Sequence, residues 1–200
     1  MSDQITISAY DVYAHAYDQG VVDFWRDFPR DFLKKFAGEL RGKRVLNLGS
    51  GSGRDAVLLR ELGLEVVCVD ASASMIAITQ ALGFESHLAR FSDIDFAPQS
   101  FDGVWAYCSL LHVQRQHAAE VLRNLRAIIR PQGLCVVGVI EGQNEARYEH
   151  EIMPDTSRYF QYYDSAQLKL LLAEASFSFV HEQQYAADGG LFLSHIYRPA

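Results

Sequence analysis

The sequence predicts a doubly wound α/β fold, in which helices cover both faces of a seven-stranded, mostly parallel sheet with an antiparallel C-terminal strand. Short runs rich in Val and Leu alternate with longer amphipathic segments, which is the pattern of strands joined by crossover helices. The last two apolar runs are separated only by the turn Asp188-Gly189-Gly190, and strands joined so closely must be antiparallel. At about 150 residues per domain, the length of 200 residues favours a single domain, 1–200.

Each element follows from a local pattern. Seven segments are expected as strands, at 45–48, 65–69, 86–90 (the weakest pattern), 102–107, 134–140, 177–185 and 191–197. Four amphipathic segments are expected as helices, at 54–62, 73–82, 116–129 and 165–175. Gly83 follows the second helix as a C-terminal cap, and Pro131-Gln132-Gly133 breaks the chain after the third.

Two segments fall outside this alternation. Residues 9–36 carry eight aromatic side chains before the first strand. Residues 141–163 are polar and aromatic, without clear periodicity, and they follow the fifth strand. Because a doubly wound sheet places its site at the carboxyl ends of the strands, we expect 141–163 to be an insertion on the substrate side.

Composition excludes several classes of protein. The 25 acidic and 18 basic residues give a net charge of −7, whereas domains that bind phosphate backbones are usually basic. The longest apolar stretch, 134–140, is far shorter than the roughly 20 residues of a membrane span. The three cysteines lie in apolar runs, and no signal peptide is apparent. We therefore expect a cytoplasmic protein that binds neither DNA nor a membrane; its oligomeric state stays open.

The most informative segment is V-L-N-L-G-S-G-S-G-R-D, residues 45–55. A strand that leads through Gly49, Gly51 and Gly53 into a helix lets the backbone approach a ligand closely. Asp70 ends the next strand, 21 residues after Gly49, where a ribose-binding carboxylate is expected. The fragment 51–56 also fits G-x-G-x-x-A, the pyrophosphate-binding pattern of nicotinamide enzymes, so the residues alone leave the nucleotide open.

Five motifs, found in order along the chain, give this sequence a family resemblance. The stretches that carry it are 45–55, 67–72 with Met75, 90–93, 100–107 and 122–133, with Tyr10, Asp11, Ala14, Tyr17 and Asp18 upstream. Together they resemble class I S-adenosylmethionine-dependent methyltransferases, of the kind with type 11 or type 25 methyltransferase domains. The resemblance extends over roughly residues 10–198, and it implies a Rossmann-like fold.

The resemblance implies S-adenosylmethionine as cofactor and S-adenosylhomocysteine as product. It implies that Asp70 takes both ribose hydroxyls and that residues 1–40 form a helical lid. The cofactor-binding residues it implies are Tyr10, Tyr17, Gly49, Ser50, Gly51, Gly53, Asp70, Ala71, Ser72, Met75, Phe91, Ser92, Asp93 and Tyr107. The chain departs from the family at Asn47, usually an acid that helps to hold the methionine amine, and at Arg90, where an acid commonly contacts adenine.

Chemistry at the acceptor is less specified. His112 follows the fourth strand and is a candidate general base, because imidazole titrates near neutrality. Arg147, Arg158 and Tyr162 are candidate substrate-binding residues, since an arginine can pair with a substrate carboxylate. No metal site is expected, because the seven histidines show neither H-E-x-x-H nor Cys-x-x-Cys spacing.

These observations predict a methyltransferase (EC 2.1.1.-) that acts on an O, N or C nucleophile of a small-molecule acceptor. One alternative is a non-catalytic S-adenosylmethionine-binding regulator or partner subunit, because a fold does not guarantee an activity. Another is an RNA methyltransferase of the transfer-RNA wobble-uridine type, which carries a similar Arg-Tyr-aromatic stretch. A nicotinamide oxidoreductase is the remote alternative, since the chain has no Tyr-x-x-x-Lys pair.

Overall fold

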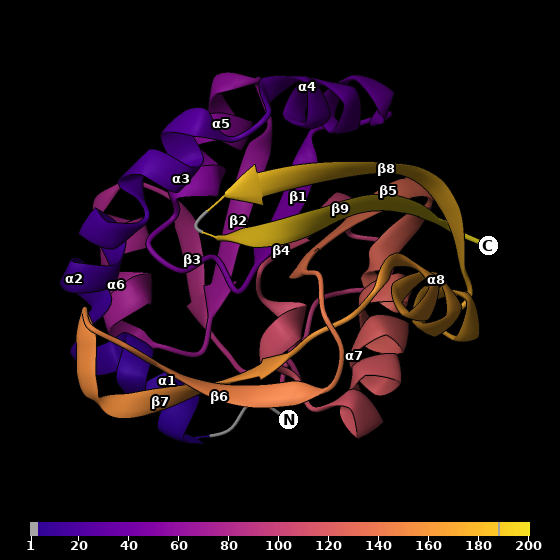
Figure 1. Cartoon of the computed structure of the whole chain (residues 1–200). Coiled ribbons are helices and arrows are strands. Elements are labelled where there is room, and N and C mark those ends of the chain that lie inside the picture. Colours follow the sequence, from indigo (N-terminus) through magenta and orange to yellow (C-terminus); the bar gives the residue numbers. More distant parts are fainter. Residues whose placement is uncertain (1–3, 188) are drawn as a thin grey trace.

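The computed structural model describes residues 4–187 and 189–200, and its centre is a seven-stranded sheet in the order β3-β2-β1-β4-β5-β9-β8 (Figure 1). The strands of this sheet are β1 (Arg44–Leu48), β2 (Glu65–Asp70), β3 (Glu85–Leu88), β4 (Phe101–Tyr107), β5 (Ile129–Ile140), β8 (Phe177–Ala187) and β9 (Gly190–Pro199). Strand β9 runs antiparallel to both of its neighbours, β5 and β8, while β1 to β5 pair in parallel. The expected fold class is confirmed.

Helices cover both faces of the sheet. They are α1 (Gln4–Val12), α2 (Ala14–Gly20), α3 (Val22–Asp27), α4 (Arg30–Glu39), α5 (Arg54–Glu61), α6 (Ala73–Ala81), the 3-10 helix η1 (Leu110–His112), α7 (Arg115–Ile128) and α8 (Ser165–Glu174). Among the described residues no helix is long and apolar enough to cross a membrane. The expected turn at 188–190 includes Asp188, and the expected N-terminal segment includes 1–3; these four residues lie outside the described part.

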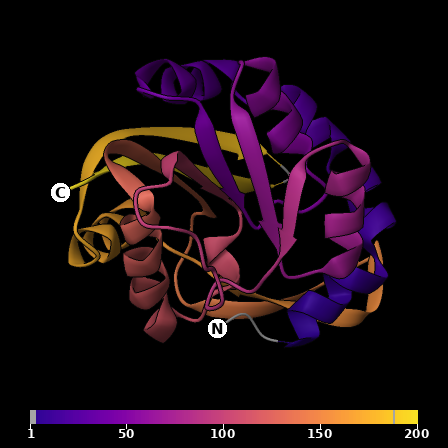
Figure 2. The ribbon, with the colours of Figure 1, turned by 180° about the vertical axis from the view of Figure 1, so that it is seen from behind.

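The core divides into two apolar clusters because successive strand residues face opposite sides. Val45 packs with α4 and α5, whereas its neighbour Leu46 packs with α7 and α8. In α7 the buried residues are Ala118, Val121, Leu122, Leu125 and Ile128, which lie on one face of a helix. Helices α7 and α8 lie side by side (Figures 1 and 2), and α8 begins with a capping box formed by Asp164 and Gln167.

Residues 141–163 hold secondary structure that the sequence analysis did not predict. They contain an antiparallel hairpin of β6 (Glu145–His150) and β7 (Met153–Gln161), in a separate two-stranded sheet. The sequence hides it because β6 is exposed along nearly its whole length and therefore lacks the alternation of a half-buried strand. Strand β7 is covered by α1, and its backbone N–H at Tyr159 donates to the Thr6 hydroxyl at 2.9 Å.

Candidate functional site

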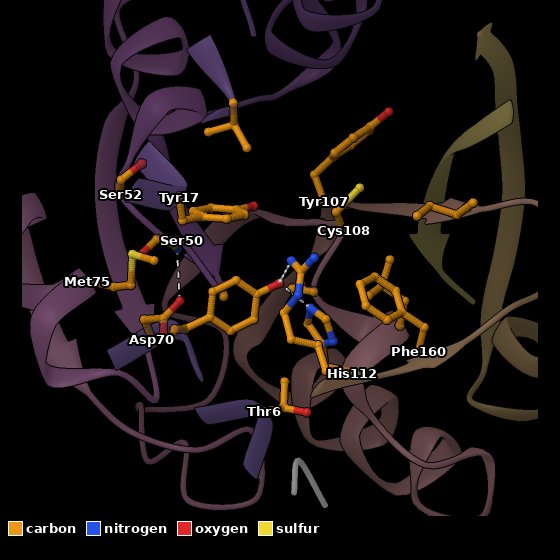
Figure 3. Close-up of a pocket in the computed structure, with 18 of the residues that line it drawn as sticks. Thr6, Tyr17, Ser50, Ser52, Asp70, Met75, Tyr107, Cys108, His112 and Phe160 are labelled. Atoms are coloured by element: carbon orange, nitrogen blue, oxygen red, sulfur yellow. Dashed lines mark hydrogen bonds between the residues drawn. The ribbon is translucent and has the colours of Figure 1, made fainter. Parts of the chain in front are cut away.

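A cavity of about 570 Å³ lies at the carboxyl ends of the central strands. Strands β1 and β4 diverge there into crossovers on opposite faces, which is the usual ligand position in a doubly wound sheet. Residues of α1, α2, α3 and the β6–β7 hairpin line the other side. Figure 3 shows Asp70 and Met75 at one end of the cavity and Tyr107 and Phe160 at the other, with Tyr17 between them.

The loop between β1 and α5 has a backbone that only glycine adopts readily. Gly49, Gly51 and Gly53 have φ values of +66°, +50° and +80°, in the left-handed region. A Cβ on Gly49 would collide with the Ser109 side chain, whereas one on Gly51 would meet only Tyr17, at 3.7 Å. Gly49 and Gly51 line the cavity, while Gly53 caps α5 behind it.

Asp70 joins this loop to the end of β2. One carboxylate oxygen accepts from the Gly51 backbone N–H at 2.9 Å, and the other accepts from the Ser72 N–H at 2.9 Å. Burial raises the pKa of Asp70, and the backbone donors oppose that rise. Each carboxylate oxygen has two lone pairs, so each one retains acceptor capacity toward the cavity after its backbone bond.

The wall beside Asp70 is largely apolar. Met75 is 1% exposed and Phe91 is 7% exposed, and both line the cavity together with Ala71 and Ser72. The predicted contacts Ser92 and Asp93 are not brought to this wall: both are exposed, and the Ser92 hydroxyl donates to the Asp93 carboxylate.

A buried acid that sequence reasoning missed lies beneath the loop. Asp55 accepts from Asn47 Nδ2 at 2.7 Å, from Trp105 Nε1 at 3.1 Å and from the Ala56 N–H at 2.8 Å. It lines the cavity, and burial raises its pKa to about 6 despite these donors. Asn47, where the family usually has an acid, thus pairs with an acid eight residues on. The signal available was an Asp in the first turn of α5, where a negative charge is favoured.

Helices α1 and α2 carry two tyrosines over the cavity. The rings of Tyr10 and Tyr17 meet edge to face with centroids 5.1 Å apart. Asp11 anchors α1, because its carboxylate accepts from the Ser72 hydroxyl at 2.8 Å and the Ser74 N–H at 2.9 Å; these bonds lower the pKa of Asp11. Farther along, Asp18 receives two 2.7 Å hydrogen bonds from Arg54.

At the centre of the cavity, Tyr10 connects His112 with Arg158. The Tyr10 hydroxyl lies 2.9 Å from His112 Nε2 and accepts from Arg158 Nη1 at 3.1 Å. His112 Nδ1 lies 2.7 Å from the Tyr159 carbonyl oxygen, which can only accept. Nδ1 therefore carries a proton, and in the neutral imidazole Nε2 is the basic nitrogen.

The far half of the cavity, which we call the aromatic chamber, is walled by rings from distant segments. They are Phe24, Trp25, Tyr107, Tyr148, Phe160, Tyr162 and Phe192. Arg158 also lines the cavity and is only 8% exposed. Arg147 is not brought there: it is exposed on β6, and its Nη1 donates to the Ser157 hydroxyl at 3.4 Å. Among the described residues no group of three or more His, Cys, Asp or Glu is placed to hold a metal.

Comparison with known proteins places this geometry in context. A family model described as "Methyltransferase domain" matches residues 46–137. The N-terminal Xaa-Pro-Lys N-methyltransferase 1 of Danio rerio is 30% identical over 167 residues, which cover 78% of this chain and 72% of that protein. The curated relatives include both N- and O-methyltransferases.

Two solved structures have the same fold. The structure of DhpI in complex with SAH is 22% identical, with a TM-score of 0.76 over 98% of this chain and 96% of that one. The 1,6-didemethyltoxoflavin-N1-methyltransferase of Burkholderia thailandensis, solved with 1,6-didemethyltoxoflavin and S-adenosylhomocysteine, is 23% identical. Its TM-score is 0.71 over 97% of this chain and 88% of that one.

Proposed function

This chain belongs to the class I S-adenosylmethionine-dependent methyltransferases, and we propose that it methylates an O, N or C nucleophile of a small-molecule acceptor bound in the aromatic chamber. The observation that carries the proposal is the two-ended cavity of about 570 Å³. Its volume is typical of a small-molecule site. One end presents the glycine loop and Asp70, and the other presents aromatic rings together with the buried cation of Arg158.

The residues at the first end fit the cofactor. Asp70 has spare acceptor capacity for ribose hydroxyls, and Met75 and Phe91 offer an apolar slot for a flat base. The Ser109 hydroxyl lines the cavity, is buried and has no hydrogen-bond partner among residues 4–187 and 189–200, so a polar group of the methionine moiety would satisfy it. When bound, S-adenosylmethionine would supply a methyl group on a sulfonium, which the acceptor nucleophile attacks in line so that S-adenosylhomocysteine leaves.

We propose His112 as the general base. Its Nδ1–H is held by the Tyr159 carbonyl, so Nε2 faces the Tyr10 hydroxyl with its lone pair. An acceptor hydroxyl or amine that replaces the Tyr10 hydroxyl there would deliver its proton to Nε2. The protein's larger contribution is alignment of the acceptor between the aromatic walls, because positioning alone can supply roughly 7–11 kcal/mol.

The proposal extends to the segments around the site and to the compartment. Residues 1–40 act as a lid within one domain, in keeping with the placement of Thr6, Ile7, Tyr10 and Tyr17 on the cavity wall. A cytoplasmic location is supported by the three cysteines, which are free thiols, as is usual in a reducing compartment.

The test has two stages. Calorimetric titration with S-adenosylmethionine, S-adenosylhomocysteine and NADH should show binding of the first two only. A screen of small-molecule acceptors with methyl-labelled S-adenosylmethionine should then give turnover, with transfer RNA as a parallel arm. Cofactor binding with no methylated product in either arm would favour the non-catalytic alternative, and methylation of transfer RNA alone would favour the RNA alternative.

A further inference from the structure

We infer that the acceptor carries an anionic oxygen group, a carboxylate or a phosphoryl group, which Arg158 receives inside the aromatic chamber. The inference rests on the proposed function, because it names the class of molecule that the chamber takes. The observation behind it is a buried guanidinium on the cavity wall for which the described residues provide no acidic partner.

The hydrogen bonds of Arg158 are incomplete. A guanidinium has five N–H donors, and the described residues accept from one of its nitrogens, Nη1, at the Tyr10 oxygen. Arg158 Nε is buried and has no hydrogen-bond partner within the described part of the chain. No carboxylate among residues 4–187 and 189–200 lies within ion-pair distance of Arg158, although Arg54 and Arg130, both more exposed, each have an aspartate. A buried cation with unsatisfied donors is costly unless a ligand pairs with it.

The surroundings hold the guanidinium in place without neutralising it. Arg158 lies over the rings of Tyr10 and Phe160, with centroid distances of 5.4 Å and 5.2 Å. These cation–π contacts orient the group but satisfy none of its N–H donors in the plane. A planar donor fork fixed in this way matches the two oxygens of a carboxylate or phosphoryl group.

The position also defines the rest of the acceptor. The Tyr10 oxygen is within hydrogen-bond distance of both Arg158 and His112, so an anionic group on Arg158 lies next to the proposed base. The remaining walls are mostly aromatic, with Glu141 and His150 also on the lining, and they favour a flat, largely apolar body. The acceptor class is therefore an aromatic or similarly flat acid. A cationic peptide such as Xaa-Pro-Lys would meet repulsion at Arg158.

The experiment measures binding of matched probes to the protein saturated with S-adenosylhomocysteine. The probes are benzoate, phenyl phosphate and benzamide, with an Xaa-Pro-Lys peptide as a further arm. Titration by calorimetry or ligand-observed NMR should show an acid binding at least about tenfold tighter than benzamide. The better of benzoate and phenyl phosphate identifies the anionic group.

Variants assign the preference to one side chain. Arg158→Gln should abolish the preference for the acid, and Arg158→Lys should retain part of it because the charge remains. Arg147→Gln is the matched control, since Arg147 lies on the same hairpin but outside the cavity, and it should behave as wild type. A melting curve without probe shows whether each variant folds, and benzoate should raise the melting temperature of wild type but not of Arg158→Gln.

The outcomes distinguish failure of the anionic-acceptor inference from failure of the proposed function. Equal binding of benzamide and the acids, no binding of any acid, a preference that survives in Arg158→Gln, or binding of the peptide instead would overturn the anionic acceptor. S-adenosylhomocysteine affinity is measured separately for every protein. If wild type does not bind it, the proposed function itself fails; if it binds while the acid preference is absent, only the present inference fails.

Discussion

The two halves of the cavity differ in the groups that form them: backbone groups of a local segment in one, and side chains from distant segments in the other. The cofactor half is built largely around backbone: the left-handed Gly49 and Gly51, the two N–H groups that donate to Asp70, and one strand end, with Met75 and Phe91 beside them. The aromatic chamber is made of side chains that arrive from α3, the end of β4, the β6–β7 hairpin with the residue that follows it, and β9. Backbone recognition is encoded within a short stretch of sequence, whereas the chamber exists only after distant segments have folded together. The curated relatives, which include both N- and O-methyltransferases, are consistent with this division.

The largest expected effect tests whether the chamber side contributes chemistry. His112→Ala should lower turnover by about 10²–10⁴-fold, the usual contribution of a positioned general base. Affinity for S-adenosylmethionine should stay within error, because the His112 ring packs against Phe160 of the aromatic chamber. Steady-state kinetics over pH and calorimetry check this. Parallel loss of cofactor binding would assign His112 a structural role instead.

The next effect tests the backbone half. Gly49→Ala should lower the free energy of unfolding by roughly 2–4 kcal/mol, because left-handed strain adds to a collision with Ser109. Gly63→Ala is the control: its φ is +83° and the space around it is open, so strain alone should cost about 1 kcal/mol. Denaturant unfolding measures both, and equal losses would refute the packing argument.

Asp70 tests whether a single side chain completes the backbone half. Asp70→Ala should weaken S-adenosylhomocysteine binding by roughly 1–3 kcal/mol, the value of hydrogen bonds to a charged group. Asp93→Ala should leave the affinity unchanged, because Asp93 is exposed and away from the cavity wall. Calorimetry on both variants decides between them, and the reverse order would restore the sequence-based role of Asp93.

The smallest expected effect concerns the stability of the chamber side, at strand β9, when the pH is lowered. Burial lowers the pKa of His195 on β9 to about 4, against about 6.5 when unfolded. The unfolded state therefore binds more protons between those values, and stability falls as the pH drops through that window. From about pH 7 to about pH 5.5, His195 should cost about 1 kcal/mol. The loss should shrink in His195→Gln, and hydrogen exchange should show β9 opening before β1; an unchanged pH dependence would contradict this.

The local character of the backbone half explains what the sequence could predict. The predicted fold, family and cofactor, S-adenosylmethionine, are confirmed. They could be predicted because the alternation of strands and helices and the glycine loop are short-range patterns. The structure also brings Gly49, Gly51 and Asp70 together as expected.

The rest depends on tertiary contacts. Asp55 looked like an ordinary first-turn acid, and only its burial with Asn47 and Trp105 makes it part of the site. Arg147 and Arg158 were equivalent candidates in the sequence. The hairpin register and the cover of α1 bury the second and expose the first, and neither factor leaves a periodic signal in 141–163.

Helix α1 is fastened on both sides of the cavity. Asp11 binds the start of α6, and Thr6 accepts from the β7 backbone. A ligand that passes beneath α1 would have to open one of these attachments. We therefore expect the release of S-adenosylhomocysteine to limit the steady-state rate. Kinetic measurements should then show a rapid first turnover followed by slower cycles.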